Sequence, residues 1–172
     1  MTSDAVLIRH LTVADAAAFR ALRVGAATDA PSAITWTPEE QSNVSLEQIA
    51  QEIDATEFQI VFGAFINNQL IGITKLMREP REKVWHKASI MGVFVDPEWR
   101  GKRIARKLLN AALDYAHTRQ EILQLQLYVN VQNTAALQLY LSFGFEGMFV
   151  VPRAIRVGDQ FFDEQLMILR LR

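Results

Sequence analysis

The stretch MGVFVDPEWRGKRIARKLLNAAL, residues 91–113, joins an apolar run to a strongly basic one across a single turn. Its first part completes the β-rich run 86–95, and Asp96-Pro97 ends that run because proline has no backbone N–H and favours turns. After Gly101 the apolar residues recur at helical spacing, which predicts a helix from about Gly101 to Thr118. The stretch therefore predicts a central strand, a tight turn and an amphipathic helix.

Five basic residues gather at the start of this helix: Arg100, Lys102, Arg103, Arg106 and Lys107. The chain as a whole is nearly neutral, with 18 Lys and Arg against 19 Asp and Glu, so the cluster needs a local target. Cations at a helix N-terminus are unfavourable by about a few tenths of a kcal/mol each, because the helix dipole is positive there. Together with a glycine and free backbone N–H groups they indicate a phosphate site. The alternative is a solvated charged face.

Length and composition narrow the function classes. The 172 residues fit one domain, 1–172, with a full-sized core. The absence of cysteine excludes disulfides, thiolate metal sites and a cysteine nucleophile, and we expect no metal site. The near-neutral charge disfavours nucleic acid or a membrane surface as partner. No signal peptide or apolar run of about 20 residues is evident, so we expect a cytoplasmic protein.

The remaining chain alternates between strand-like and helix-like segments. The expected elements are a strand at 5–11, a helix from Thr12 to near Gly25, a surface loop at 28–43, a short helix at 45–54, hairpin strands at 58–66 and 69–77 around Asn67-Asn68, a strand at 122–129, a helix at 133–143 ended by Gly144, and a hairpin of 145–157 and 160–171 around Gly158-Asp159. This order, β-αα-βββ-α-β-α-ββ, predicts an α/β protein with a mixed sheet and helices on both faces. The P-loop and GxGxxG patterns are absent, which disfavours those nucleotide folds.

Two motifs resemble those of the GNAT superfamily of N-acetyltransferases. Residues 91–113 look like its coenzyme-A-binding motif, whose pattern Q/R-x-x-G-x-G/A falls here on Arg100 to Ala105. The stretch NVQNTAALQLYLSFGFE, residues 130–146, resembles the second motif, an Asn-started helix with a Tyr followed by Gly-Phe. The resemblance covers essentially the whole chain, and it implies a GNAT-like, mostly antiparallel mixed sheet. Arg103 departs from the motif, which normally has glycine there.

The resemblance also implies acetyl-CoA as cofactor and assigns residues to it. The expected cofactor-binding residues are Val93, Phe94, Val95, Arg100, Gly101, Lys102, Arg103, Ile104, Ala105, Arg106, Asn133 and Tyr140. The pantetheine arm would pair with the backbone of Val93–Val95, and the cations would serve the diphosphate and the 3′-phosphate. The Arg103 side chain then either points away from the pyrophosphate or reaches the 3′-phosphate.

Acyl transfer to an amine needs a proton donor for the leaving thiolate and a neutral amine. By the same resemblance Tyr140 is the general acid, although it also shares a helical stripe with Leu137 and Leu141 and could simply pack in the core. Without cysteine, direct attack by the amine is the simplest route.

The identity of the general base stays open among several groups. His86 is the first candidate because of its intrinsic pKa, Glu79 and Glu82 are comparable, and a water relay would leave no mark in the sequence.

By the same resemblance, the acceptor amine is expected near the 28–43 loop and the turn between the last two strands. Trp36, Glu39 and Glu40 are candidate contacts, since carboxylates and aromatic faces attract ammonium groups. The alternative is a loop with solvated acids.

The leading hypothesis is an acetyl-CoA-dependent N-acetyltransferase that acts on a primary amine of a small molecule or a peptide. A non-catalytic acyl-CoA sensor with the same fold is the alternative. A nucleic-acid binder is disfavoured by the net charge and by the lack of aromatic residues among the cations. The amine's identity and the choice between monomer and homodimer stay open.

Overall fold

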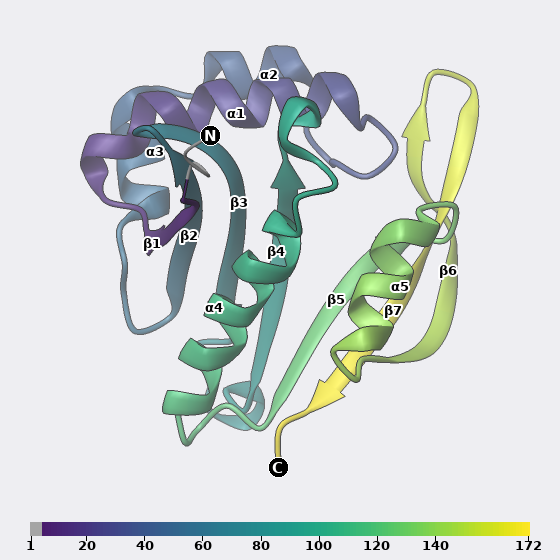
Figure 1. Cartoon of the computed structure of the whole chain (residues 1–172). Coiled ribbons are helices and arrows are strands. Elements are labelled where there is room, and N and C mark those ends of the chain that lie inside the picture. Colours follow the sequence, from purple (N-terminus) through teal and green to yellow (C-terminus); the bar gives the residue numbers. More distant parts are fainter. Residues whose placement is uncertain (1–4) are drawn as a thin grey trace.

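The structure is a computed structural model that describes residues 5–172. Within that range seven strands form one mixed sheet in the order β1-β2-β3-β4-β5-β7-β6 (Figure 1). The strands are β1 (Leu7–His10), β2 (Gln59–Ile66), β3 (Gln69–Arg78), β4 (Lys87–Val95), β5 (Gln124–Asn130), β6 (Glu146–Val157) and β7 (Gln160–Arg170). The α-helices are α1 (Ala16–Asp29), α2 (Pro38–Asn43), α3 (Leu46–Ile53), α4 (Ile104–Thr118) and α5 (Thr134–Ser142). All neighbouring strands are antiparallel except β4 and β5.

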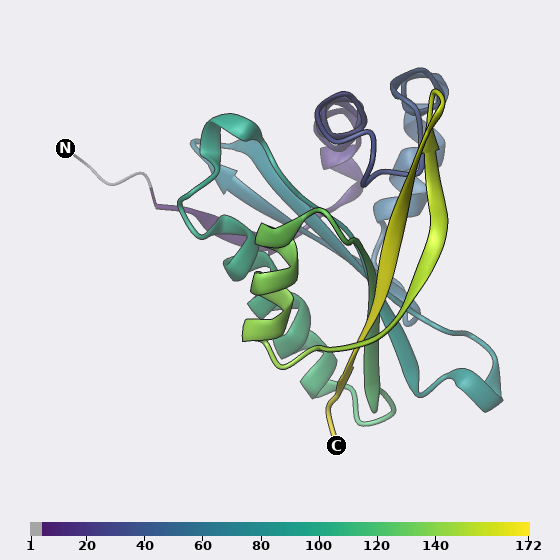
Figure 2. The ribbon, with the colours of Figure 1, turned by 90° about the vertical axis from the view of Figure 1, so that its right-hand side faces the viewer.

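Helices cover both faces of the sheet, which confirms the predicted fold class. Figure 2 shows α1, α2 and α3 on one side of the sheet and α4 and α5 on the other. The alternation of side chains along β2 explains this, since Val61 and Phe65 pack in the core under α1 and α3, whereas Ala64 and Ile66 pack under α4. None of the helices in residues 5–172 is long and apolar enough to cross a membrane.

Two expectations for the segment before β2 are wrong. The first helix does not end near Gly25 but continues to Asp29, because a glycine inside a helix costs only about 1 kcal/mol relative to alanine and the buried Ala26 and Ala27 pack beyond it. The 28–43 segment is not entirely a loop, because it contains α2. There Thr37 and Glu40 form a capping box, with the Thr37 hydroxyl accepting from the Glu40 N–H.

The predicted turns are confirmed by backbone geometry. Asn67 and Asn68 connect β2 to β3 with φ of 48° and 65°, the left-handed conformations that a two-residue hairpin turn requires. Asp96 ends β4, and its carboxylate accepts from the Glu98 N–H at 3.0 Å in the 3₁₀ turn Pro97–Trp99. Each of these short polar residues lies where the chain must change direction.

A bulge in β4 is one feature that sequence reasoning missed. Ile73 of β3 pairs with Phe94 of β4, but Lys75 pairs with Met91, so β4 carries one extra residue. Gly92 lies in the extra segment with φ of 60°. A lone glycine inside a strand pattern is the signal that could have revealed it.

The strands β4 and β5 separate before this bulge, after Ser89. The parallel pairing between them is confined to Lys87–Ser89 against Gln124–Gln126, and Figure 1 shows the two strands diverging towards the C-terminal end of β4. The sheet is therefore closed at one end of β4 and open at the other.

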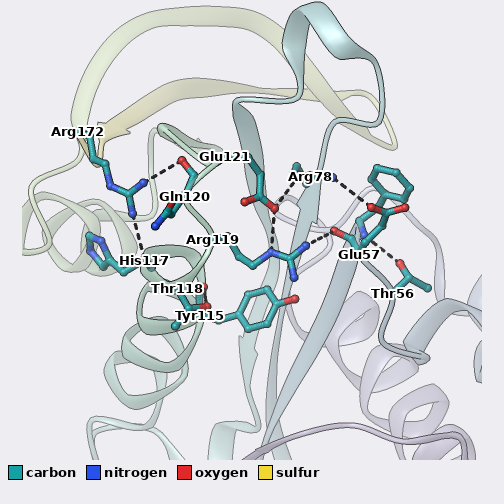
Figure 3. Close-up of polar contacts among 11 residues, drawn as sticks. Thr56, Glu57, Arg78, Tyr115, His117, Thr118, Arg119, Gln120, Glu121 and Arg172 are labelled. Carbon is teal, nitrogen blue, oxygen red and sulfur yellow. Dashed lines mark hydrogen bonds and ion pairs between the residues drawn. The ribbon is translucent and has the colours of Figure 1, made fainter.

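An ion-pair cluster lies at the closed end, where the chain returns from α4 to β5 (Figure 3). The Arg78 side chain is only 8% exposed, and its Nη1 lies 2.9 Å from the Glu121 carboxylate, while its Nη2 lies 3.7 Å from that of Glu57. Arg119 also contacts Glu121, with Nε at 3.0 Å. Glu121 thus joins the end of β3 to the loop before β5.

Removing Glu121 should destabilise the fold. Glu121→Ala leaves the buried Arg78 guanidinium with the longer contact to Glu57 as its remaining ion pair, and we expect the free energy of unfolding to fall by about 1–2 kcal/mol. Glu57→Ala is the matched control, since the Glu57 side chain is 65% exposed. Urea unfolding of both variants tests this, and equal losses would contradict the role assigned to Glu121.

Candidate active site

A cavity of about 690 Å³ opens where β4 and β5 diverge. Its walls come from the second half of β4, the end of β5, the start of α5 and the loop that follows α1. The predicted residues Val93, Phe94 and Val95 line it on the β4 side. Because β5 has left, backbone N–H and C=O groups of β4 face the cavity on that edge, and such groups need a hydrogen-bonding partner. An extended ligand with amide groups would satisfy them.

The turn before α4 differs from its predicted form. The helix begins at Ile104, not at Gly101, because Gly101 and Arg103 have left-handed φ values of 79° and 60°. Arg103 therefore takes the backbone conformation for which the related motif normally uses glycine. The N–H groups of the first helical turn have no intrahelical acceptor. They lie beside a smaller cavity of about 300 Å³ whose lining includes Gly101, Arg103, Ile104, Ala105 and Arg106.

The basic side chains of this turn are partly engaged by the protein. The Arg100 guanidinium forms an ion pair with Asp29 and donates to the Val95 carbonyl at 3.1 Å. This contact ties the C-terminus of α1 to the end of β4. Arg100 lines both cavities, and these two contacts hold its guanidinium group in place.

Two further cations lie beside aromatic rings. The Lys102 ammonium is 4.2 Å from the Trp99 ring centroid, above that ring. Arg106 donates to the Ser142 hydroxyl at 2.7 Å and lies over the Phe143 ring, so it joins α4 to α5. Arg106 lines the smaller cavity, and with Arg103 it leaves positive charge beside the turn.

Tyr140 of α5 and Asn133, the residue that caps this helix, both line the large cavity. Tyr140 is 7% exposed and packs edge-on against Phe145 with ring centroids 5.9 Å apart, so it does belong to the core. Burial raises the pKa of the Tyr140 phenol to about 12, which keeps it protonated at neutral pH. Asn133 caps α5, accepting from the Ala136 N–H at 3.1 Å, and also lines the cavity.

A second cavity, of about 540 Å³, lies on the other side of the opening, towards α1 and α3. It shares Gly92, Phe94, Tyr128 and other lining residues with the first cavity, so the two meet at the bulge. The loop after α1 contributes to both, and the buried Asn130 holds it by donating to the Ser32 carbonyl at 2.9 Å. One opening in the sheet thus serves two cavities.

The second cavity contains a charged group that sequence reasoning did not find. Arg23 and Lys75 approach the same carboxylate, that of Glu52, at 2.6 Å and 3.8 Å. Burial is the main reason that the Lys75 pKa is lowered, with the nearby Arg23 charge acting in the same direction. A lysine inside the apolar run 69–77 was the signal in the sequence.

Glu164 is a further cavity residue that sequence reasoning did not find. It lies on β7 opposite Asn130 of β5 and lines both cavities. Burial raises the pKa of its carboxyl group above the ordinary value. An acid within the aromatic and apolar segment 160–171 was its signal.

The candidate bases named from sequence lie elsewhere. His86 precedes β4 at the closed end, where its carbonyl accepts from the N–H groups of Leu123 and Gln124. Glu79 and Glu82 belong to the connection between β3 and β4 at that same end. The bulge and the opening lie at the other end of β4, so the structure does not bring these three residues to the cavities.

Of the three candidate contacts for the acceptor amine, one lines a cavity and two do not. Trp36 lines the second cavity. Glu39 and Glu40 instead lie in the first turn of α2, outside the cavity linings, and Glu40 accepts from the Thr37 N–H at 2.8 Å in the capping box. That hydrogen bond lowers the Glu40 pKa, so this carboxylate stabilises a helix end.

Comparison with known proteins agrees with this geometry. Residues 25–145 match the Acetyltransferase (GNAT) family. A GNAT acetyltransferase structure from Streptococcus pneumoniae superposes with a TM-score of 0.87 at 22% identity, covering 97% of this chain and 100% of that one. A putative acetyltransferase from Salmonella typhimurium, solved with its cofactor acetyl-CoA, gives a TM-score of 0.81 at 22% identity, with 98% and 95% covered. These two likenesses concern the fold.

Curated relatives carry several acceptor names. A spermidine N(1)-acetyltransferase of Vibrio cholerae is 36% identical over 76 residues, which is 44% of this chain and 42% of that protein. A mycothiol acetyltransferase of Brachybacterium faecium is 33% identical over 147 residues, 84% of this chain and 42% of that protein. The chain thus spans less than half the length of these two relatives.

The bulge predicts that replacing Gly92 destabilises the fold. Gly92→Ala places a side chain at a left-handed φ, and we expect the free energy of unfolding to fall by about 1 kcal/mol. No steric clash adds to this, because a Cβ there would meet nothing within 4 Å.

Gly25→Ala is the matched control, because a Cβ at Gly25 in the interior of α1 also meets nothing within 4 Å. It should raise the free energy of unfolding by about 0.5–1 kcal/mol. Denaturant titration compares the two variants, and stabilisation by Gly92→Ala would refute the bulge.

Proposed function

The chain belongs to the GNAT family of acetyltransferases, and we propose that it transfers the acetyl group of acetyl-CoA to a primary amine of a small molecule or a peptide. The observation that carries the proposal is that Tyr140 and the free edge of β4 line one cavity, the basic turn before α4 lines another, and the two cavities share Val95, Arg100 and Ala105 as lining residues. Family membership supports acetyl-CoA as the donor. We also propose that the protein is cytoplasmic and that it binds neither nucleic acid nor a membrane.

The residues present fit acetyl-CoA. The left-handed turn at Gly101 and Arg103 exposes backbone N–H groups at the start of α4, and Arg103 and Arg106 add positive charge for phosphate groups. The unpaired edge of β4 suits the amide groups of the pantetheine arm. The volume of about 690 Å³ lies within the usual range for small-molecule and cofactor sites.

Acetyl-CoA supplies the acetyl group as a reactive thioester, and the residues of the chain act around it. A backbone N–H of β4 would stabilise the charge that develops on the thioester oxygen. The Tyr140 hydroxyl would donate its proton to the sulfur as the carbon–sulfur bond breaks and the carbon–nitrogen bond forms. Overall, an ammonium ion and the thioester give an amide, a free thiol and one proton. The chain has no cysteine, so a cysteinyl acyl-enzyme is excluded, and direct attack by the amine is the simplest route.

Tyr140→Phe tests the proposed acid. Thiol release from acetyl-CoA in the presence of an accepted amine should fall about 10²-fold or more in kcat, whereas calorimetry should show little change in acetyl-CoA affinity. Because burial raises the Tyr140 pKa to about 12, loss of its proton should not lower the rate between pH 8 and pH 10.

Tyr115→Phe is the control, since Tyr115 on α4 packs edge-on against Phe62 outside the cavity linings. Unchanged turnover in Tyr140→Phe would remove Tyr140 as the acid. Binding of acetyl-CoA without thiol release for any amine would favour the sensor alternative.

A further inference from the structure

We propose that the acceptor is a small-molecule amine that also carries a carboxylate, several bonds away from its amino group. The amine would lie against Glu164 and the carboxylate against Arg23 and Lys75, at the two ends of the second cavity. The proposal rests on the proposed function and names its substrate class.

The Arg23 end of the cavity has more positive than negative charge. Arg23 and Lys75 share the single carboxylate of Glu52, so this group of three carries a net charge of about +1 when all are ionised. The Arg23 contact, at 2.6 Å, is a hydrogen bond, but the Lys75 contact at 3.8 Å is longer than one. The Lys75 ammonium thus retains hydrogen-bonding capacity for an anionic group that enters the cavity.

Burial makes this charge costly without a counter-ion. The Lys75 side chain is 16% exposed, and desolvation is the largest influence on its pKa. A carboxylate from a ligand would neutralise this positive charge. The site is partly buried, so solvent screens the attraction between the two charges only weakly. The cavity therefore favours an anion at this end.

The Glu164 end of the cavity favours a cation. Glu164 lines both the second cavity and the cleft between β4 and β5, so an amine beside it would lie next to the free edge of β4. Its carboxylate attracts an ammonium group, and its partial burial strengthens that attraction. The reacting nitrogen is thus expected at the junction of the two cavities.

The distance between the two ends sets the size of the acceptor. Lys75 lies on β3 and Glu164 on β7, with β4 and β5 between them in the sheet. Neighbouring strands lie about 4.8 Å apart, so the two backbones are separated by roughly 14 Å or more. Side chains shorten the gap but leave room for several methylene groups, and apolar residues including Met91 and Ile90 line the space between.

The same charges disfavour a diamine. A second ammonium group on the acceptor would face Arg23 and Lys75, and like charges in a partly buried site repel each other. The spermidine specificity named for one relative is therefore not expected here.

A matched series of amines tests the substrate class. Thiol release from acetyl-CoA is measured with glycine, 4-aminobutanoate, 6-aminohexanoate and 8-aminooctanoate, with the corresponding alkylamines, and with 1,6-diaminohexane. We expect kcat/KM for the best of the longer amino acids to exceed that for its alkylamine by about tenfold or more, because only the amino acid can form a charge-assisted hydrogen bond with Lys75. Glycine and the diamine should be poor acceptors.

Variants connect the preference to the named residues. Lys75→Met should reduce the ratio of kcat/KM between amino acid and alkylamine, while Lys83→Met, an exposed lysine at the closed end of the sheet, should leave that ratio unchanged. Lys75→Glu should shift the preference towards 1,6-diaminohexane. Thermal unfolding checks that each variant is folded.

The outcomes separate this proposal from the proposed function. Turnover with some amine but no gain from the carboxylate at any chain length would overturn the substrate class and leave N-acetylation standing. Best activity with glycine would also overturn it. No turnover with any amine would overturn both.

Discussion

The site depends on one feature of the sheet, the edge of β4 that has no strand partner after Ser89. Pairing between β4 and β5 is confined to three residues on each strand. The unpaired part of β4 contains the bulge, where Gly92 has a left-handed φ and the strand carries an extra residue relative to β3. Unpaired backbone groups beside a cavity are unfavourable until a ligand pairs with them. The unpaired edge of β4 is thus the part of the sheet that a ligand would bind.

Both cavities follow from that opening. The larger one borders Tyr140 and shares Arg100 with the cavity beside the basic turn. The second borders Trp36 and the Arg23–Glu52–Lys75 group, so the donor and the acceptor would approach from opposite sides of the opening. At the closed end the Arg78 cluster joins β3 to the loop before β5. The fold therefore combines a fixed end with an open one, and Gly92 lies between them.

Local patterns predicted the elements well, because strand period, helix period and turn residues act over a few positions. Thr12 to Asp29 shows where that fails, since packing of Ala26 and Ala27 carried the helix past Gly25. The site was predicted unevenly. Tyr140 and Asn133 came from a motif, whereas Glu164 and Lys75 reach the cavities only through strand register, which one sequence does not specify. His86 looked suitable by its chemistry, but it lies at the wrong end of its strand.

The most direct measurement is amide hydrogen exchange with and without acetyl-CoA. If the opened edge of β4 and the turn before α4 bind this molecule, its addition should slow exchange in residues 93–95 and 101–106, while residues 78–86 at the closed end keep their rates. Saturating acetyl-CoA that leaves residues 93–95 and 101–106 unprotected would contradict the assignment of the opening in the sheet as the cofactor site.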